Sequence, residues 1–559
     1  MSKKTVALLL AALMLFGVVA AGCTKTGGST GGNADKKPMI LHWNLGEEPP
    51  NVDSVTTTDQ VSFWIVNATQ EGLVRQIENQ PATKGSGLAK DWTISPDGMT
   101  YTFTLRDAKW SDGQPVTAKD FEFAWKRAMN PKTAAEYSYQ YAYIKGYDVV
   151  SSIDVKAADA DQKIKEALDN VGVKAKDDKT LEVTLAAPTP YFLSLMSFPT
   201  FLPQRQDIVE KYGEKYASDP DKMVYSGPFT ITEWTHESKM VFTKNPNYWD
   251  KDNVKLDGME TTMIKDINTP VNMYEAGELD MINVPAEFLE QYKSKGVVQT
   301  RAQSTTWYIE FNTKDPIFKN ANMRKAFSLA IDRQTFVDKV LANGSIPALA
   351  YTPPTIAGEK GPFHDLVGNI LNPKADTAAA KAALEAGLKE LGLTKAPQIS
   401  FLSGDSERAK KWAVAVQEMW KQNLGVDVNI ETVAFKVRLD RMTKGQYQIV
   451  FAGWGADYND PMTFIDMWRT APADNPGNNS AFYNNTEYDK LVDDAKATGD
   501  QARRMDDMQK AEKILLAELP IAPIFHPAWN FIEKPYVKGI QRFAVGADLD
   551  FKTATVDAH

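Results

Sequence analysis

Apolar and polar residues alternate along most of the chain with two periods, one typical of strands and one typical of helices. Residues 38–43 form a short, mostly apolar run that predicts a first strand, which the following glycine and prolines would end. A hairpin is predicted between Trp92 and Arg106. Ser95 to Gly98 read Ser-Pro-Asp-Gly, a turn sequence, and apolar residues alternate after it.

Helices are predicted where apolar residues recur every three or four positions. Thr117 has the features of an N-cap, with Asp120 three residues later. Residues 322–342 keep the helical spacing throughout, so one continuous helix is expected there. Asp376 and Ser406 begin two further helices.

Strands return after these helices. Residues 426–430 alternate between apolar and polar, and residues 447–451 predict another strand that ends at Phe451. Because strands and helices are interleaved over most of the chain, the sequence predicts an α/β protein with sheets flanked by helices.

Composition limits the class of protein and its partners. The chain has 559 residues, 43% of them apolar and 24% charged, enough for several cores at about 150 residues each. The net charge of −9 argues against nucleic acid as the main partner, since phosphate binding needs clustered cations. Beyond the N-terminus no apolar run approaches the roughly 20 residues that span a bilayer, which excludes a polytopic membrane protein.

The N-terminus has the features of an export signal. Lys3 and Lys4 precede an apolar run over residues 6–19, and small residues lead to Cys23. Cys23 is the only cysteine, so it cannot form a disulfide within the chain, and cleavage before it would make it the new N-terminus. The alternative is an ordinary secretory signal that a cysteine happens to follow. We expect residues 1–22 to be a lipoprotein signal peptide and Cys23 to be lipidated, as in a bacterial lipobox.

Residues 23–37 continue as a segment rich in glycine, serine and threonine. A segment of this composition behaves as a flexible coil with an end-to-end distance of roughly 20 Å. It would tether the folded part of the chain to the outer face of a membrane.

Motifs for metal or nucleotide binding do not occur in the sequence. Residues 27–31 formally match G-x-S-x-G, but the strand before and the helix after that a nucleophile elbow needs are not predicted there. The five histidines are scattered, none forms H-E-x-x-H, and one cysteine excludes a cysteine-based zinc site. Neither a phosphate-binding glycine loop nor an EF-hand loop is present. We therefore expect neither an enzyme nor a bound metal or cofactor, although distant residues could still assemble a catalytic group.

Residues 453–461, Gly-Trp-Gly-Ala-Asp-Tyr-Asn-Asp-Pro, follow the last of these predicted strands. Glycines on both sides of Trp454 allow a ligand or another backbone to approach closely. Asp457 and Asp460 place carboxylates just past a strand end, where open α/β sheets bind ligands. A helix N-cap fits Asp460 before Pro461 well, and for Asp457 a turn and a ligand role both remain open.

Aromatic residues are frequent in loop-like sequence. The chain has 13 Trp, 20 Tyr and 25 Phe, and residues 137–143 read Tyr-Ser-Tyr-Gln-Tyr-Ala-Tyr. Most aromatic residues fill cores, but those near turns also suit a binding cleft. Tyr137 is therefore a candidate for such a cleft.

Five stretches follow one another in an order typical of one protein family. They are residues 44–53, 92–120, 226–229 with 245–249, 324–333 and 453–461. With them the chain resembles the oligopeptide-binding lipoproteins of ABC importers, which belong to extracellular solute-binding protein family 5, peptide/nickel type. The resemblance covers essentially the whole mature chain.

The resemblance implies an α/β fold of the two-lobed periplasmic-binding-protein type II, with an extra small domain and mixed sheets flanked by helices. A hinge joins the lobes, and the cleft between them closes over an extended peptide. The implied parts are a signal peptide at 1–22, a tether at 23–37, lobe I at 38–70, 196–280 and 524–559, the additional small domain at 71–195, and lobe II at 281–523.

The resemblance also implies how the peptide is held. Asp457 takes the α-ammonium of the peptide, and the backbones of residues 453–455 and 58–60 pair with it from the two lobes. Phe435 matches an aromatic position near the peptide. With the tyrosine candidate added, the expected peptide-binding residues are Asp457, Gly453, Trp454, Gly455, Thr58, Asp59, Gln60, Phe435 and Tyr137.

The chain departs from the family where a cation holds the carboxylate of the peptide. The matching positions carry Phe451, Ala409 and Asp315. Lys314, Arg408 or Arg438 could supply the clamp instead, or none of them does. The preferred peptide length therefore stays open.

The implied function is capture of oligopeptides outside the cytoplasm and delivery to the permease of an ABC importer, by a lipid-anchored bacterial monomer. Within the family the ligand could instead be a dipeptide, a nickel chelate, haem or a sugar oligomer, and the motif around Asp457 favours peptides. A pheromone receptor or an adhesin is a second alternative. A secreted hydrolase would need a nucleophile and base that the sequence does not show.

Overall fold

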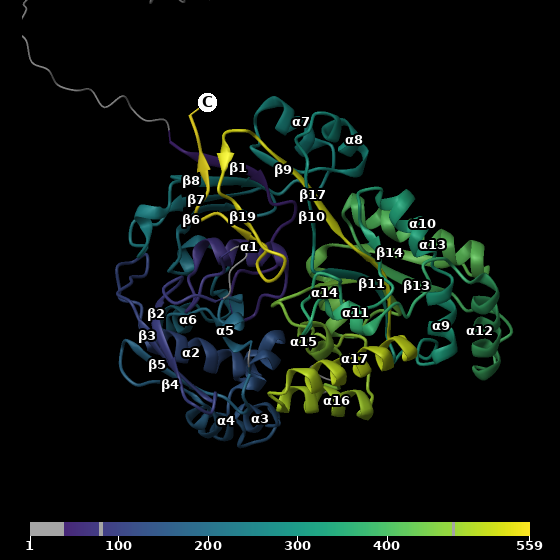
Figure 1. Ribbon diagram of the computed structural model, residues 1–559, viewed down its shortest axis with the longest axis horizontal. Helices are drawn as coiled ribbons and strands as arrows, with labels where there is room; N and C mark the ends of the chain where they lie inside the picture. The colour runs from purple at the N-terminus through teal and green to yellow at the C-terminus, as the bar shows by residue number, and fades with distance from the viewer. Residues whose placement is uncertain (1–37, 78–81, 190, 472–475, 559) are drawn as a thin grey trace, which may run out of the picture. The chain divides into compact units, whose positions relative to one another are not determined.

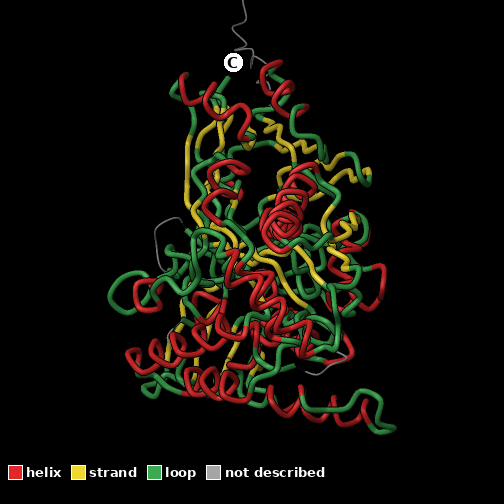
Figure 2. Tube along the Cα trace, turned by 90° about the vertical axis from the view of Figure 1, so that its right-hand side faces the viewer, coloured by secondary structure: helices red, strands yellow, loops and turns green. Residues whose placement is uncertain are grey.

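The computed structural model describes residues 38–77, 82–189, 191–471 and 476–558 (Figure 1). The expected signal peptide at 1–22, the tether at 23–37 and the lipidation site Cys23 lie outside the described residues. Strands and helices alternate along the described chain, as the sequence predicts for an α/β protein (Figure 2).

A seven-stranded mixed sheet contains the first strand. In spatial order its strands are β10 (Gln299–Ala302), β17 (Ala528–Glu533), β9 (Met281–Asn283), β1 (Ile40–Asn44), β8 (Gly258–Thr262), β7 (Lys239–Lys244) and β6 (Phe229–Thr235). β1 lies at the centre and runs parallel to β8 and β9, and the outer strands pair antiparallel. Leu41 and Trp43 of β1 share a core with Ile65 and Val66 of α1 (Gln60–Thr69).

A six-stranded mixed sheet forms the second large layer. Its strands are β12 (Ile346–Pro347), β16 (Ile521–His526), β11 (Thr305–Phe311), β15 (Ile449–Gly455), β13 (Ile399–Gly404) and β14 (Val428–Val433). Successive residues of a strand face opposite sides of the sheet. Ile449 accordingly packs with α9 (Ala321–Leu329), α12 (Thr377–Glu390) and α13 (Glu407–Leu424). Val450 instead belongs to the core of α15 (Met462–Ile465), α16 (Thr486–Ala497) and α17 (Gln501–Glu518) (Figure 1).

A four-stranded antiparallel sheet belongs to the segment between residues 71 and 195. Its strands are β2 (Ala89–Ile94), β3 (Thr100–Leu105), β5 (Thr180–Thr184) and β4 (Val173–Ala175). The hairpin predicted between Trp92 and Arg106 is confirmed. The predicted N-cap is confirmed as well, because Thr117 and Asp120 form a capping box on α2 (Ala118–Met129).

Two adjacent segments connect the seven-stranded and six-stranded sheets. β10 leads into β11 through Gln303 and Ser304, and β16 leads into β17 through Pro527. The amide of Gln303 donates a hydrogen bond to the carbonyl oxygen of Pro527 at 3.1 Å. The sheets therefore divide the chain near residues 303 and 527, and not at 280 and 524 as expected from sequence. The residue pattern of β9 and β10 shows strands but does not show which sheet they join.

The single helix expected over residues 322–342 is wrong. The segment contains α9, then α10 (Arg333–Thr335) and a π-helix (Phe336–Leu341). Asp332 accepts a hydrogen bond from the amide of Thr335 and so caps a new helix start. Apolar spacing continues across this break, which is why the pattern alone did not reveal it.

The remaining helices surround these sheets and connect their strands. They are α3 (Tyr147–Ser151), α4 (Ala160–Asn170), α5 (Phe192–Leu195), α6 (Gln206–Tyr212), α7 (Thr269–Ala276), α8 (Ala286–Ser294), α11 (Phe363–Val367), α14 (Phe435–Thr443), α15 (Met462–Ile465), α16 (Thr486–Ala497) and α17 (Gln501–Glu518). Among the described residues, no helix has both the length and the apolar character needed to cross a bilayer.

Candidate functional site

The strand predicted to end at Phe451 continues as β15 to Gly455, so the predicted end is wrong. Each residue as far as Gly455 keeps a partner on β11, and Gly453 lies opposite Trp307. A Cβ atom at Gly453 would come within 2.8 Å of the Trp307 ring, so this position requires glycine. The two glycines are exposed, and Trp454 between them is buried.

The edge of β15 that faces away from β11 is open. On that side β15 pairs with β13 only at Ile449 and Val450. In the described parts of the chain, no strand pairs with residues 451–455 along this edge. An extended segment of another molecule could therefore add to the sheet here through backbone hydrogen bonds.

Trp454 connects this edge to the segment that precedes α3. Its indole nitrogen donates to the carbonyl oxygen of Thr463 at 2.9 Å. Its ring stacks on Tyr137, with ring centroids 6.0 Å apart and planes at 25°. Tyr137 lies in a 3₁₀-helix (Glu136–Tyr143), so the structure brings the predicted residues Trp454 and Tyr137 together.

Asp457 follows two residues after β15, and its carboxylate is buried, with 6% of the residue exposed. Tyr137 donates its hydroxyl to Oδ1 at 3.2 Å, and Gln140 donates its amide to Oδ2 at 2.8 Å. Within the described residues, no lysine or arginine forms an ion pair with Asp457. Burial raises the pKa of the Asp457 carboxyl well above its ordinary value, since neutral donors offset the lost hydration only in part.

Asp460, three residues further on, shows the opposite arrangement. Its carboxylate is 7% exposed and pairs with the guanidinium of Arg504, with Nη1 and Oδ2 2.6 Å apart. Its Oδ1 also accepts from the amide of Met462, two residues further on, as in an Asx turn. The N-cap of α15 is Pro461, so the predicted N-cap role of Asp460 is wrong. One loop thus holds a fully paired carboxylate and one that lacks a cation among the described residues.

The side chains of residues 58–60 serve the fold. Asp59 caps α1 by accepting from the amide of Ser62, and burial raises its pKa to about 6. Gln60 donates to the carbonyl oxygen of Gly546 and to Asp548. Thr58, which precedes them, is half-buried. A role of this segment in peptide binding would therefore have to use its backbone.

Arg438, in the first turns of α14, lies where the open edge of β15 begins. Its Nη1 donates to the carbonyl oxygen of Phe451, and its guanidinium lies 5.3 Å from the ring of Phe435. Burial lowers the pKa of Arg438, and the nearby carboxylate of Glu47 acts against that change. The guanidinium of Arg408 lies 5.2 Å from the ring of Trp412, and Glu47 influences this arginine as well.

Lys314 is placed at the other end of α14. Its ammonium lies 3.8 Å from the centre of the Phe482 ring, and that ring packs against Gly445, which follows the helix. Arg438 and Phe435 instead occupy the start of α14. Of the three expected clamp residues, Arg438 and Arg408 are therefore near one shared acidic residue, and Lys314 has a different environment.

Sequence reasoning missed Gln140, Thr463 and Gly546. Gln140 could have been found, because a 3₁₀-helix repeats every three residues and so aligns it with Tyr137. No spacing in the sequence indicates Thr463, although its Oγ1 accepts a hydrogen bond from the amide of Asp457 at 3.0 Å. Gly546 lies in the last part of the chain, far from the motif in sequence, and nothing local indicates its contact.

The arrangement is suited to binding. Asp457 can take a cation, the edge at 451–455 can take an extended backbone, and Arg438 can take an anion. The described residues contain no group of three or more His, Cys, Asp or Glu side chains placed to hold a metal ion.

The chain matches a known family over most of its length. The family model for bacterial extracellular solute-binding proteins, family 5, middle region, matches residues 85–515. The chain is 37% identical to the oligopeptide-binding protein OppA of Bacillus subtilis, over 94% of this chain and 95% of that protein. The structure titled Listeria monocytogenes OppA bound to peptide is 36% identical, with a TM-score of 0.84 over 94% of this chain and 100% of that chain.

Two structures of the murein tripeptide-binding protein MppA give a further comparison. One, from Escherichia coli, is 29% identical, with a TM-score of 0.80 over 94% of this chain and 99% of that chain. The other, titled as the unliganded open form, is 30% identical over the same shares, and its TM-score is 0.58. The described chain therefore resembles the Escherichia coli MppA structure more than the unliganded open form.

Proposed function

The chain belongs to the bacterial extracellular solute-binding proteins of family 5, and from this we propose that it captures oligopeptides outside the cytoplasm and delivers them to the permease of an ABC importer. The family consists of solute-binding proteins and not of enzymes. Relatives named for oligopeptide binding, one of them in a peptide-bound structure, support the choice of ligand.

The observation that carries the proposal is the buried carboxylate of Asp457, which lacks a cation among the described residues. A buried carboxylate is costly unless it is paired, and its two side-chain donors are both neutral. The α-ammonium of a peptide would supply the missing charge. This role for Asp457 explains why a carboxylate is kept in a site that raises its pKa.

The open edge of β15 provides the second part of the binding site. A peptide with its ammonium at Asp457 would extend along residues 451–455 as an added strand. Backbone pairing does not depend on side-chain identity, so one site can accept many sequences. The exposed glycines leave space for the peptide next to Trp454.

The far end of this edge is where the peptide carboxylate would lie. We infer that Arg438 is the main clamp for it, because its guanidinium already lies at Phe451, where the edge begins. Arg408 is a second positive charge near the same acidic residue, Glu47. With roughly 3.3 Å per residue, the stretch from Asp457 to Phe451 fits a peptide of about four to six residues.

Closure of two lobes would complete the site. We infer that lobe I comprises residues 38–70, 196–302 and 528–559, the small domain residues 71–195, and lobe II residues 303–527. The paired connections at Gln303 and Pro527 are suited to act as the hinge. The lower TM-score against the open form of MppA supports a closed arrangement.

Membrane attachment is a separate part of the proposal. Acylation of Cys23 and removal of residues 1–22 would anchor the protein, because two acyl chains bind a membrane stably whereas one chain binds it only weakly. Mass spectrometry of the N-terminal peptide from bacterial membranes tests this, with Cys23→Ser as the control. An unmodified Cys23 in membrane-bound protein would contradict the anchor and leave peptide binding untouched.

Native mass spectrometry of the purified protein tests the ligand class directly, since a bound peptide appears as added mass. Calorimetry then compares one tetrapeptide with its N-acetylated form. We expect the free amino end to bind at least a hundredfold more tightly, in line with the loss of about 3 kcal/mol when a buried charge pair is halved. Equal affinities would contradict the assigned role of Asp457.

A further inference from the structure

The C-terminal arm, which we define as residues 541–550, is a hairpin fixed along one face of α1. It consists of β19 (Gln541–Arg542), a turn, and β20 (Leu549–Asp550). Gln60, Trp64 and Asn67 lie four and three positions apart, so they share a face of the helix. All three side chains donate hydrogen bonds to arm residues 546–549.

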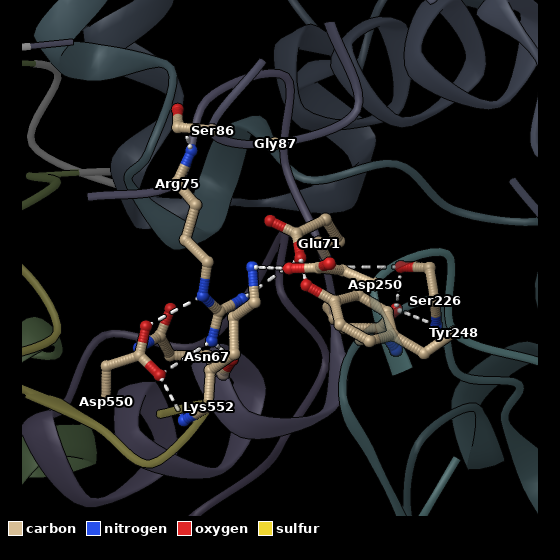
Figure 3. Close-up of polar contacts among 12 residues, drawn as sticks. Asn67, Glu71, Arg75, Ser86, Gly87, Ser226, Tyr248, Asp250, Asp550 and Lys552 are labelled. Carbon is tan, nitrogen blue, oxygen red and sulfur yellow. Dashed lines mark hydrogen bonds and ion pairs between the residues drawn. The ribbon is translucent and has the colours of Figure 1, made fainter. Parts of the chain in front are cut away.

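The base of the arm is held by buried charges. Asp550 forms a two-point pair with Arg75, at 2.7 Å to Nε and 3.0 Å to Nη2 (Figure 3). On the other strand, the carbonyl oxygen of Arg542 accepts from Arg301 of β10 at 3.1 Å. The arm is therefore firmly attached to the side of the molecule that carries the seven-stranded sheet.

The tip of the arm contacts the loop that carries the ligand-binding carboxylate. The amide of Gly546 donates to the carbonyl oxygen of Ala456 at 2.7 Å. Gly546 has φ of +71°, and a Cβ atom there would lie 3.3 Å from the carbonyl oxygen of Asp457. Only glycine combines this backbone conformation with so close an approach. The amide of Ala456 in turn donates to the carbonyl oxygen of Ser304, the residue that precedes β11.

We propose that the C-terminal arm positions Asp457 on the peptide's amino end and slows peptide release, through the hydrogen bond from Gly546 to Ala456. The inference rests on the proposed peptide-binding function. It adds Gly546, which has no role in that function as proposed above. The arm is attached to the seven-stranded sheet, and Ala456 follows a strand of the six-stranded sheet. The bond therefore exists only when the two lobes are closed.

A contact made only in the closed state changes the rate of opening more than the rate of capture. Peptide encounter occurs with the lobes apart, before the arm can reach Ala456. Dissociation requires the Gly546 hydrogen bond to break together with the lobe contacts. Differential affinity of this kind shifts the equilibrium toward the closed form, and its loss should appear mainly in the dissociation rate.

The test substitutes Gly546→Ala and compares it with Gly425→Ala. Gly425 follows α13 with φ of +70° and has open space where a Cβ atom would lie, so it carries the same backbone strain without the contact. Stopped-flow fluorescence with a labelled, free-amino tetrapeptide measures both rate constants. We expect Gly546→Ala to release the peptide roughly tenfold faster with an unchanged association rate, and Gly425→Ala to match the wild type.

A second measurement separates positioning from general stability. If the arm orients Asp457, Gly546→Ala should also reduce the preference for free over N-acetylated tetrapeptide, and Gly425→Ala should not. Gln60→Ala, which removes the side chain that holds the Gly546 carbonyl group, should cause the same change to a smaller extent. Gln60→Ala keeps the test available if Gly546→Ala does not fold.

The inference is overturned if Gly546→Ala and Gly425→Ala release the peptide at equal rates, or if selectivity for the free amino end is unchanged in both arm variants. These results differ from a failure of the proposed function, in which the wild-type protein itself would bind no peptide.

Discussion

Two buried acidic sites in this molecule differ in whether a cation lies beside the carboxylate. In the network around Arg75, the guanidinium binds Asp550 and reaches Glu71, so buried carboxylates and a cation lie together (Figure 3). Around Asp457, the side-chain donors are the neutral Tyr137 and Gln140. The first site contains its own cation, and the second has only neutral side-chain donors, so we propose that a ligand supplies its positive charge.

The directions of the pKa shifts express this difference. Burial alone would lower the pKa of Arg75, but the charges of Asp550 and Glu71 raise it, so the cation is kept. Burial raises the pKa of Asp457, and neutral hydrogen bonds reverse this only in part. Burial of a charge therefore does not by itself mark a functional site. Burial without an opposite charge leaves a cost that neutral donors offset in part, as at Asp59, or that a ligand would remove, as we propose for Asp457.

Removing the cation from the network around Arg75 should have the largest effect. Arg75→Met would leave Asp550 and Glu71 buried without the guanidinium that they bind, and we expect it to lower the free energy of unfolding by about 3–5 kcal/mol. Denaturant unfolding of the unliganded protein measures this. Lys119→Met, which breaks an exposed pair with Asp178, is the control and should change stability much less, because water screens that pair. If Arg75→Met and Lys119→Met lost similar free energies of unfolding, the buried pair would contribute no more to stability than the exposed one.

Removing the charge from the site around Asp457 should affect binding and not stability. Asp457→Asn is expected to weaken binding of a free-amino peptide by about 2–5 kcal/mol in calorimetry. The unliganded variant should be at least as stable as the wild type, because a buried charge is gone. Asp460→Asn is the matched control in the same loop, and it should destabilise the protein by leaving Arg504 unpaired. If Asp457→Asn lost as much stability as Asp460→Asn, both carboxylates would stabilise the fold, and the proposed contrast would be wrong.

The opposite end of the site can be tested with the peptide carboxylate. Arg438→Met should weaken binding of a free-acid tetrapeptide by about tenfold, as expected for one charge-assisted hydrogen bond. The same peptide with an amidated C-terminus should bind wild type and variant alike. Competition fluorescence with the two peptides measures both affinities. Equal weakening for the two peptides would mean that Arg438 only supports the backbone at Phe451.

The smallest expected effect is a dependence of affinity on pH. The pKa of Asp457 is raised in the unliganded protein, and a bound ammonium would lower it, so the unliganded protein binds more protons. Affinity should therefore rise severalfold between about pH 4 and pH 7, below the titration of the peptide's own amino group. Asp457→Asn should lose this dependence. If the variant keeps the same slope, another group is responsible.

Local elements were well predicted from sequence, and long-range partners were not. The capping box at Thr117 and the hairpin at Trp92 depend on residues a few positions apart, and the structure confirms both. The break at Asp332 was missed because apolar spacing continues through it. Residues 281–302 were expected in lobe II but join the sheet that contains β1, because the residues of a strand do not show which strands it pairs with.

The candidate site divides in the same way. Asp457, Trp454 and Tyr137 were expected, and the structure brings these three together. The assignment of Asp457 to an ammonium stays a prediction. The side chain of Gln60 was expected beside the peptide, and it instead holds the arm at Gly546, which the sequence pattern did not indicate at all.

The sequence by itself determined the α/β alternation, the family, and a motif in which glycines flank a tryptophan ahead of an aspartate. These features arise from short-range periodicity and from residue types that stand next to one another. Only the tertiary structure decided which carboxylate is paired with a cation and which has neutral donors alone. That outcome depends on desolvation and on charges brought from distant parts of the chain, such as Arg504 beside Asp460, and no local pattern contains those distances.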